Sequence, residues 1–145
     1  HSTSSVFLGP GTSFTNNSAT SGGAVFVDSA AVVSSGAQFT GNRAFAGSGS
    51  IGGAGIALAR SSAAGALTVR ASRFQGNDAD SDGGAIDVAY ASASSTPVLV
   101  ENSAFIQNIF CYHGGALHFA NLNAAVVRGN LFDRNGNVGG CATSS

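Results

Sequence analysis

Short stretches in which apolar and polar residues alternate recur along the whole chain. One set follows pairs of glycines and reads 25-VFV-27, 56-IAL-58, 86-IDV-88 and 117-LHF-119. A second set precedes phenylalanines, as in 67-LTV-69, 98-VLV-100 and 125-AVV-127. Alternation over three to six residues is typical of β-strands, and no apolar period of 3.6 residues persists anywhere. The pattern therefore predicts an all-β chain of short strands.

These strands belong to a repeat. The tetrapeptide F-x-x-N occurs at 14–17, 39–42, 74–77, 105–108 and 132–135, and a Gly-Gly pair follows each copy. Successive phenylalanines are 25, 35, 31 and 27 residues apart, with an insertion at 43–51 in the second copy. Each repeat offers three apolar pieces that are too short to form a sheet alone but can stack on the next repeat at about 4.8 Å. We predict one domain over residues 1–145, folded as a right-handed parallel β-helix of about five rungs with three short strands per rung.

The repeated residues have expected structural roles in this coil. The phenylalanines should stack as an aromatic row inside it: Phe14, Phe39, Phe74, Phe105 and Phe132. The asparagines should turn the chain at one corner: Asn17, Asn42, Asn77, Asn108 and Asn135. Asparagine tolerates left-handed backbone, and its amide can bond to turn backbone or to the asparagine of the next rung.

Aligning the repeats also places charged residues on neighbouring rungs. Arg70, Glu101 and Arg128 should form a surface charge ladder. Asp87 and His118 should be neighbours in an outward-facing row. An Asp–His pair can serve in acid–base chemistry, but no nucleophile is expected beside it, so a pair on the outer surface is the favoured interpretation.

The composition agrees with a packed domain that has few charges. Hydrophobic residues make up 43% and charged residues 9% of the chain, lysine is absent, and the formal net charge is −1. This charge does not favour nucleic acid as a partner, and no apolar run reaches the roughly 18 residues that cross a bilayer. The chain begins at His1 in a polar stretch. We therefore expect a processed chain or a segment of a longer one, with other domains or subunits at the ends of the coil.

Five copies of F-x-x-N are interleaved with Gly-Gly motifs, three of which read G-G-A-[ILV]. These pairs resemble the repeats of chlamydial polymorphic outer-membrane proteins. Related repeats occur in large surface proteins with the pectin-lyase-like fold. The resemblance covers nearly the whole chain and implies a secreted, surface-displayed β-helix with an adhesive or structural role. The chain lacks anything similar to the outer-membrane translocation domain of those proteins, and its lysine-free composition also fits a eukaryotic surface protein.

The sequence 77-NDADSDGGAIDV-88 contains D-x-D-x-D-G, the opening of many calcium loops. The candidate ligands are Asp78, Asp80, Asp82 and Asp87, the carboxylates with no predicted architectural role. The twelfth position is Ala89 rather than the glutamate that such loops require. The repeat instead places the first three in a variable corner. A solvated turn is the favoured interpretation and calcium the alternative; no other cofactor is expected.

Two further features would suit an extracellular protein. Cys111 and Cys141, the only cysteines, are candidates for a disulfide. Asn16 opens the glycosylation sequon Asn16-Asn17-Ser18.

We predict a non-catalytic structural or adhesive β-solenoid at the cell surface, alone or as a component of a surface filament. Its expected partners are surface proteins or glycans. The alternative is a carbohydrate-binding or polysaccharide-cleaving β-helix. Few acids, no lysine and mostly short loops speak against the enzyme.

Overall fold

The chain winds so that each turn contributes one strand to each of several parallel sheets. The structure, a computed structural model, describes residues 4–45, 51–60, 65–94 and 97–137. Sheet A contains β1 (Ser5–Leu8), β5 (Ala31–Ser35), β9 (Leu67–Arg70), β13 (Val98–Glu101) and β17 (Ala125–Arg128). Sheet B contains β2 (Ser13–Thr15), β6 (Gln38–Thr40), β10 (Arg73–Gln75), β14 (Ala104–Ile106) and β18 (Leu131–Asp133). The chain order of the strands within each sheet equals their spatial order, as a solenoid requires.

Two further sheets complete the turn. Sheet C contains β3 (Ser18–Ala19), β7 (Arg43–Ala44), β11 (Asp78–Ala79) and β15 (Ile109–Phe110). Sheet D contains β4 (Val25–Asp28), β8 (Ile56–Arg60), β12 (Ile86–Ser94) and β16 (Leu117–Leu122). Rung 1 is β1–β4, rung 2 is β5–β8, rung 3 is β9–β12, rung 4 is β13–β16, and rung 5 is β17–β18. The predicted parallel β-helix is confirmed. In addition to the three predicted strands, rungs 1 to 4 have the two-residue strands of sheet C at the corner after the asparagine.

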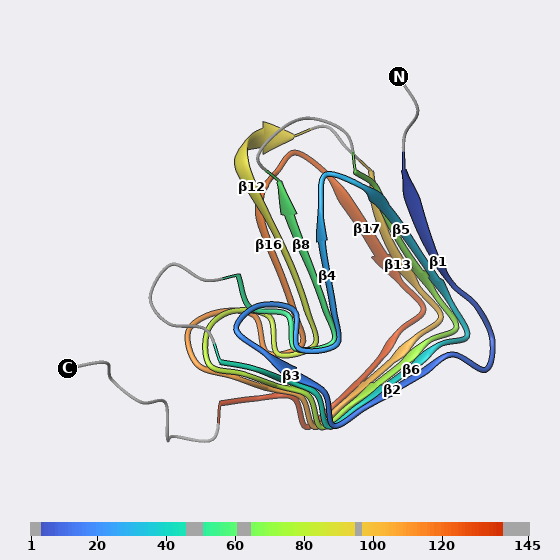
Figure 1. Cartoon of the computed structure of the whole chain (residues 1–145), viewed down its shortest axis with the longest axis vertical. Coiled ribbons are helices and arrows are strands. Elements are labelled where there is room, and N and C mark those ends of the chain that lie inside the picture. The colour runs from blue at the N-terminus through green and yellow to red at the C-terminus, as the bar shows by residue number, and fades with distance from the viewer. Residues whose placement is uncertain (1–3, 46–50, 61–64, 95–96, 138–145) are drawn as a thin grey trace.

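Successive rungs overlie one another when the molecule is viewed along the coil (Figure 1). Sheets A, B and D enclose the interior. Sheet C and the turn after it form a lobe beside the start of sheet D. Within the described ranges there is no helix long and apolar enough to cross a membrane.

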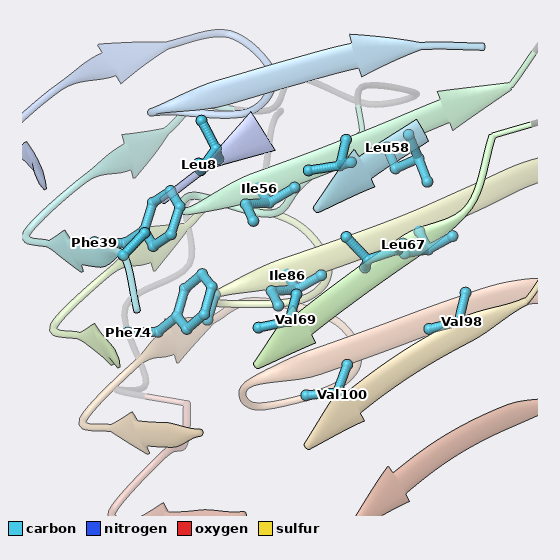
Figure 2. Close-up of a cluster of buried hydrophobic side chains, with 14 of the residues drawn as sticks. Leu8, Phe39, Ile56, Leu58, Leu67, Val69, Phe74, Ile86, Val98 and Val100 are labelled. Atoms are coloured by element: carbon cyan, nitrogen blue, oxygen red, sulfur yellow. The ribbon is translucent and has the colours of Figure 1, made fainter. Parts of the chain in front are cut away.

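The predicted aromatic row fills the interior beside sheet B. The rings of Phe14, Phe39, Phe74, Phe105 and Phe132 stack with centroid separations of 5.1, 4.5, 5.0 and 5.1 Å. The three middle rings are completely buried. Figure 2 shows Phe39 above Phe74 and Ile56 above Ile86, each pair on successive rungs. Burial of each such side chain contributes roughly 1.5–3 kcal/mol, so the row is a main source of stability.

The predicted asparagine corner is a continuous hydrogen-bonded ladder. Asn77 Nδ2 donates to Asn108 Oδ1 at 2.8 Å and to the carbonyl of Phe39 at 3.0 Å. Asn77 Oδ1 accepts from the backbone N–H and the side-chain amide of Asn42 at 3.1 and 2.9 Å. The same side-chain bonds join Asn17 to Asn42 and Asn108 to Asn135. Asn42, Asn77 and Asn108 are completely buried, so the ladder satisfies polar groups that would otherwise be costly inside the protein.

The Gly-Gly corner requires glycine for a steric reason. Gly83 has φ +58°, and a Cβ there would lie 2.3 Å from the Ile86 carbonyl oxygen. Gly53 has φ +67° and the same relation to Ile56. Since Ile56 pairs with Ile86, Gly53 is the counterpart of Gly83, and Gly52 is the extra residue of the second copy. The fifth Gly-Gly pair lies outside the described residues.

A second polar ladder lies between sheets A and B, two residues before the phenylalanines. The Ser103 hydroxyl accepts a bond from the Ser72 N–H at 3.1 Å, and Asn130 Oδ1 accepts one from the Ser103 N–H at 2.9 Å. Ser72 Oγ also lies 3.0 Å from Ser34 Oγ. These contacts link rungs 2 to 5 at a corner where the chain turns from sheet A into sheet B.

Candidate functional site

Four titratable side chains meet where the lobe joins sheet D on rungs 3 and 4. Asp82 and His113 directly precede the first glycine of the Gly-Gly pairs on these rungs, so they occupy the same place on successive turns. Asp82 Oδ1 lies 2.8 Å from His113 Nδ1 and accepts the His113 backbone N–H at 2.9 Å. The backbone itself therefore holds Asp82 against the next rung.

The second pair lies on sheet D. Asp87 of β12 and His118 of β16 are register partners, as predicted, and Asp87 Oδ1 lies 2.9 Å from His118 Nδ1. This hydrogen bond raises the pKa of His118 above its ordinary value; burial opposes the rise, and the charges of Asp87 and Asp82 add to it.

The prediction that Asp87 is a surface residue without an architectural role is wrong. Asp87 is only 2% exposed. Its Oδ2 accepts the backbone N–H of Gly52 at 2.9 Å, and Gly52 belongs to the turn before β8 on the preceding rung. That turn covers the outward face of β12, so the Asp87 carboxylate joins three successive rungs: it bonds Gly52 on rung 2 and His118 on rung 4.

The two pairs form one cluster. The rings of His113 and His118 stack with centroids 5.8 Å apart. Asp82, His113 and His118 each offer a ligating atom, and these three atoms lie within 4.8 Å of one another. Imidazole nitrogens and a carboxylate oxygen are a donor set that can hold a transition-metal ion.

The other two predicted calcium ligands lie elsewhere. Asp78 Oδ2 lies 3.7 Å from Arg43 Nε, and Asp80 Oδ1 lies 3.3 Å from Arg43 Nη2. Burial raises the pKa of Asp78, with Arg43 opposing the rise and Asp80 adding to it. Asp78 and Asp80 therefore neutralise an arginine of rung 2, and of the four predicted ligands only Asp82 and Asp87 belong to the cluster. The calcium site stays a prediction.

The predicted charge ladder is present on sheet A. Glu101 accepts from Arg70 Nε on one side and from Arg128 on the other, each at 2.7 Å. The hydrogen bond from Arg128 lowers the pKa of Glu101; partial burial opposes this, and the two positive charges and the Arg70 bond reinforce it. This arrangement holds rungs 3 to 5 together and has no evident chemical role.

The remaining predicted sites are single residues. Asn16 is exposed, with left-handed backbone (φ 54°), and its glycosylation stays a prediction. Cys111 is in disulfide form. Cys141, the other cysteine of the chain, lies outside the described residues, so their pairing also stays a prediction.

Sequence reasoning missed the contact between Asp82 and His113. The Asp87–His118 pair was found because both residues fall on strands with a clear alternation. Asp82 and His113 fall in corners of variable composition. Counting backwards from the Gly-Gly pairs is the signal that aligns them.

Fold and repeat together define the class of this protein: a parallel β-solenoid built from F-x-x-N and Gly-Gly repeats. Residues 11–28, which run from the turn between β1 and β2 to the end of β4, match the family model of the Chlamydia polymorphic membrane protein repeat. This part of the chain is thus similar to a repeat of the Chlamydia polymorphic membrane proteins. Comparisons with curated proteins and with solved structures give no significant match.

Proposed function

We propose that this chain is a rigid, non-catalytic segment of a cell-surface protein that presents its lateral faces to proteins or glycans. One observation carries the proposal. The residues that recur in every repeat are used for architecture: phenylalanines in the core, asparagines in the ladder and glycines at the corner. What the repeat preserves is therefore a shape, while the outward residues differ from rung to rung.

Rigidity follows from the same contacts. Every rung is joined to the next by parallel strand pairing in sheets A and B, by the ring stack and by the asparagine ladder. Such a solenoid keeps its two ends at a fixed separation and displays a long side surface. These properties suit a spacer or an adhesive stalk, alone or as part of a surface filament.

Surface display is tested on intact cells that produce the protein. Antibodies raised against the folded chain should label these cells without permeabilisation, and external protease should remove the label. Adhesion is tested by coating beads with the folded chain and with an unfolded variant such as Gly83→Val, whose added side chain would collide with backbone. We expect adhesion of the beads that carry the folded chain and none of the beads that carry the unfolded variant. Labelling only after permeabilisation would contradict the proposal.

The convergence of two aspartates and two histidines on rungs 3 and 4 favours a second candidate, a carbohydrate-active β-helix. The polysaccharide-cleaving form of this candidate would use the clustered side chains for proton transfer. Incubation of the folded chain with acidic and neutral polysaccharides separates the two candidates. New reducing or unsaturated ends that disappear in His118→Gln would support the carbohydrate-active candidate, and unchanged polysaccharide supports the structural one.

A further inference from the structure

We propose that Asp82, His113 and His118 form a binding site for a divalent transition-metal ion, with Zn²⁺ as the probe. Their ligating atoms lie within 4.8 Å of one another. Asp82 and His113 come from equivalent corner positions on rungs 3 and 4, and His118 comes from β16, which follows the rung 4 corner. Two successive rungs therefore converge on one point. The site would lie on the side of the coil, at the junction of the lobe with sheet D.

The repeat geometry holds the ligands in place without the metal. Asp82 is fixed by the backbone N–H of His113 at 2.9 Å. His118 lies on β16 and is about one quarter exposed, whereas the side chain of His113 is 74% exposed. Two of the three ligands are therefore positioned by the fold, and the third is free to turn towards an ion.

Asp87 supplies the outer contact that such sites use. Metal-bound histidines generally donate their second ring N–H to a carboxylate or carbonyl, which fixes the tautomer and the ring orientation. The buried Asp87 carboxylate lies 2.9 Å from His118 Nδ1 and is itself held by the N–H of Gly52. With the proton of His118 on Nδ1, the lone pair is on Nε2 and available to a metal.

Binding requires a small contraction. Zinc holds nitrogen and oxygen ligands at about 2.0–2.2 Å, so two ligands at a tetrahedral angle are roughly 3.4 Å apart. The three ligating atoms now lie within 4.8 Å of one another, so their side chains must shift slightly to bind one ion. An ion between Asp82 and His113 would then replace their direct hydrogen bond.

The donor set selects the class of ion. Calcium takes six to eight oxygen ligands, whereas imidazole nitrogens suit zinc, copper, nickel and cobalt. Two imidazoles and one carboxylate therefore favour a transition metal over the calcium that the D-x-D-x-D-G sequence suggests. Three protein ligands leave a fourth position for water or an external donor.

The experiment is a calorimetric titration of the untagged folded chain with Zn²⁺, repeated with Ca²⁺. We expect one zinc equivalent per chain, and at least tenfold weaker binding in His113→Gln and in His118→Gln. His1→Gln is the matched control, because His1 is the only other histidine; it should leave the affinity unchanged. Asp78→Asn is the acidic control and should also bind zinc normally. Circular dichroism verifies that each variant is folded, and His113 is exposed enough that its replacement should leave the fold intact.

Asp87 acts as a positioning residue in this proposal, so its test needs a separate readout. Asp87→Asn should weaken zinc binding by about 10–100-fold and should shift the ¹⁵N resonances of the His118 ring away from the Nδ1–H form. The proposal is overturned if the folded double variant His113→Gln/His118→Gln binds zinc as tightly as the unchanged chain. It is overturned equally if binding is lost in His1→Gln, or if calcium competes with zinc at equal concentration.

Discussion

The asparagine ladder makes Asn77→Ala the most informative single substitution in this fold. Asn77 is completely buried. Its side chain donates to Asn108 Oδ1 and to the Phe39 carbonyl, and it accepts from the N–H and the amide of Asn42. Alanine removes all four bonds and leaves the backbone N–H of Asn42 without its acceptor.

The expected cost follows from these contacts. A hydrogen bond inside a protein contributes about 1 kcal/mol net, and a buried donor left without a partner costs about 1–3 kcal/mol. Loss of the four bonds should therefore lower the free energy of unfolding by about 3–5 kcal/mol. Asn17→Ala is the matched control: Asn17 is exposed, and its side chain donates one bond, to Asn42 Oδ1 at 2.9 Å. Its cost should not exceed about 1 kcal/mol.

Asn77→Asp separates hydrogen bonding from packing, because the two side chains have nearly the same shape. Aspartate keeps one acceptor but turns an oxygen towards the Phe39 carbonyl and Asn108 Oδ1, which are both acceptors. A buried carboxyl in this place has a raised pKa in the folded state, so its deficit relative to the unchanged chain should grow as pH rises above about 4. Asn77→Ala should show no such growth.

The measurement is urea unfolding followed by far-ultraviolet circular dichroism at pH 4 and pH 7, since the chain contains no tryptophan. Equal slopes for the variants would show that the same surface is exposed on unfolding. The reasoning is refuted if Asn77→Ala costs no more than Asn17→Ala, or if Asn77→Asp matches the unchanged chain at pH 7.

Three further predictions concern other corners of the coil. Gly83→Ala should lower the free energy of unfolding by at least 2 kcal/mol more than Gly76→Ala in urea unfolding: both have φ near +60°, but only at Gly83 does a Cβ meet backbone, whereas nothing lies within 4 Å at Gly76. The pKa of Glu101 is lowered, so the stabilisation from its arginine contacts is present above its ordinary pKa of 4.5 and is lost as pH falls through the pKa of the folded state. Glu101→Gln should therefore flatten the acid limb of a plot of melting temperature against pH. An unchanged acid limb would contradict this prediction. Ser81→Ala should leave the melting temperature the same or raise it, since within the described residues the buried Ser81 hydroxyl has no hydrogen-bond partner; a clear fall would show that the hydroxyl has a partner.

Repetition explains which parts of the fold were predictable. Phe74, Asn77 and Gly83 recur at corresponding places in every copy, so their stacking, hydrogen bonding and turn geometry could be inferred from one alignment. The strands of sheet C were not predictable, because two residues are too few to show an alternation. The ladder of Ser72, Ser103 and Asn130 was missed for a related reason: serine and asparagine perform the same task there, so no single residue type marks the position.

The candidate site was only partly predictable. The register of Asp87 with His118 follows from the strand pattern. The burial of Asp87 does not, because it depends on how the turn at Gly52 folds over the neighbouring rung. Asp82 was predicted as a possible metal ligand, but together with Asp78 and Asp80, which contact Arg43 instead. Which side chain each aspartate contacts depends on the path of the lobe. The corner sequences differ from repeat to repeat, so no simple period in the sequence predicts that path.

The asparagine ladder also gives the coil a direction. In every step the amide nitrogen of one rung donates to the carbonyl oxygen of the following rung, from Asn17 to Asn42 and onwards to Asn135. The amide dipoles therefore add like those of a helix, and each bond polarises the next. Between the asparagine side chains, each rung therefore donates to the following rung and accepts from the preceding one. A rung inserted in reverse would set donor against donor, so coils of this kind can grow, shorten or join through this corner only head to tail.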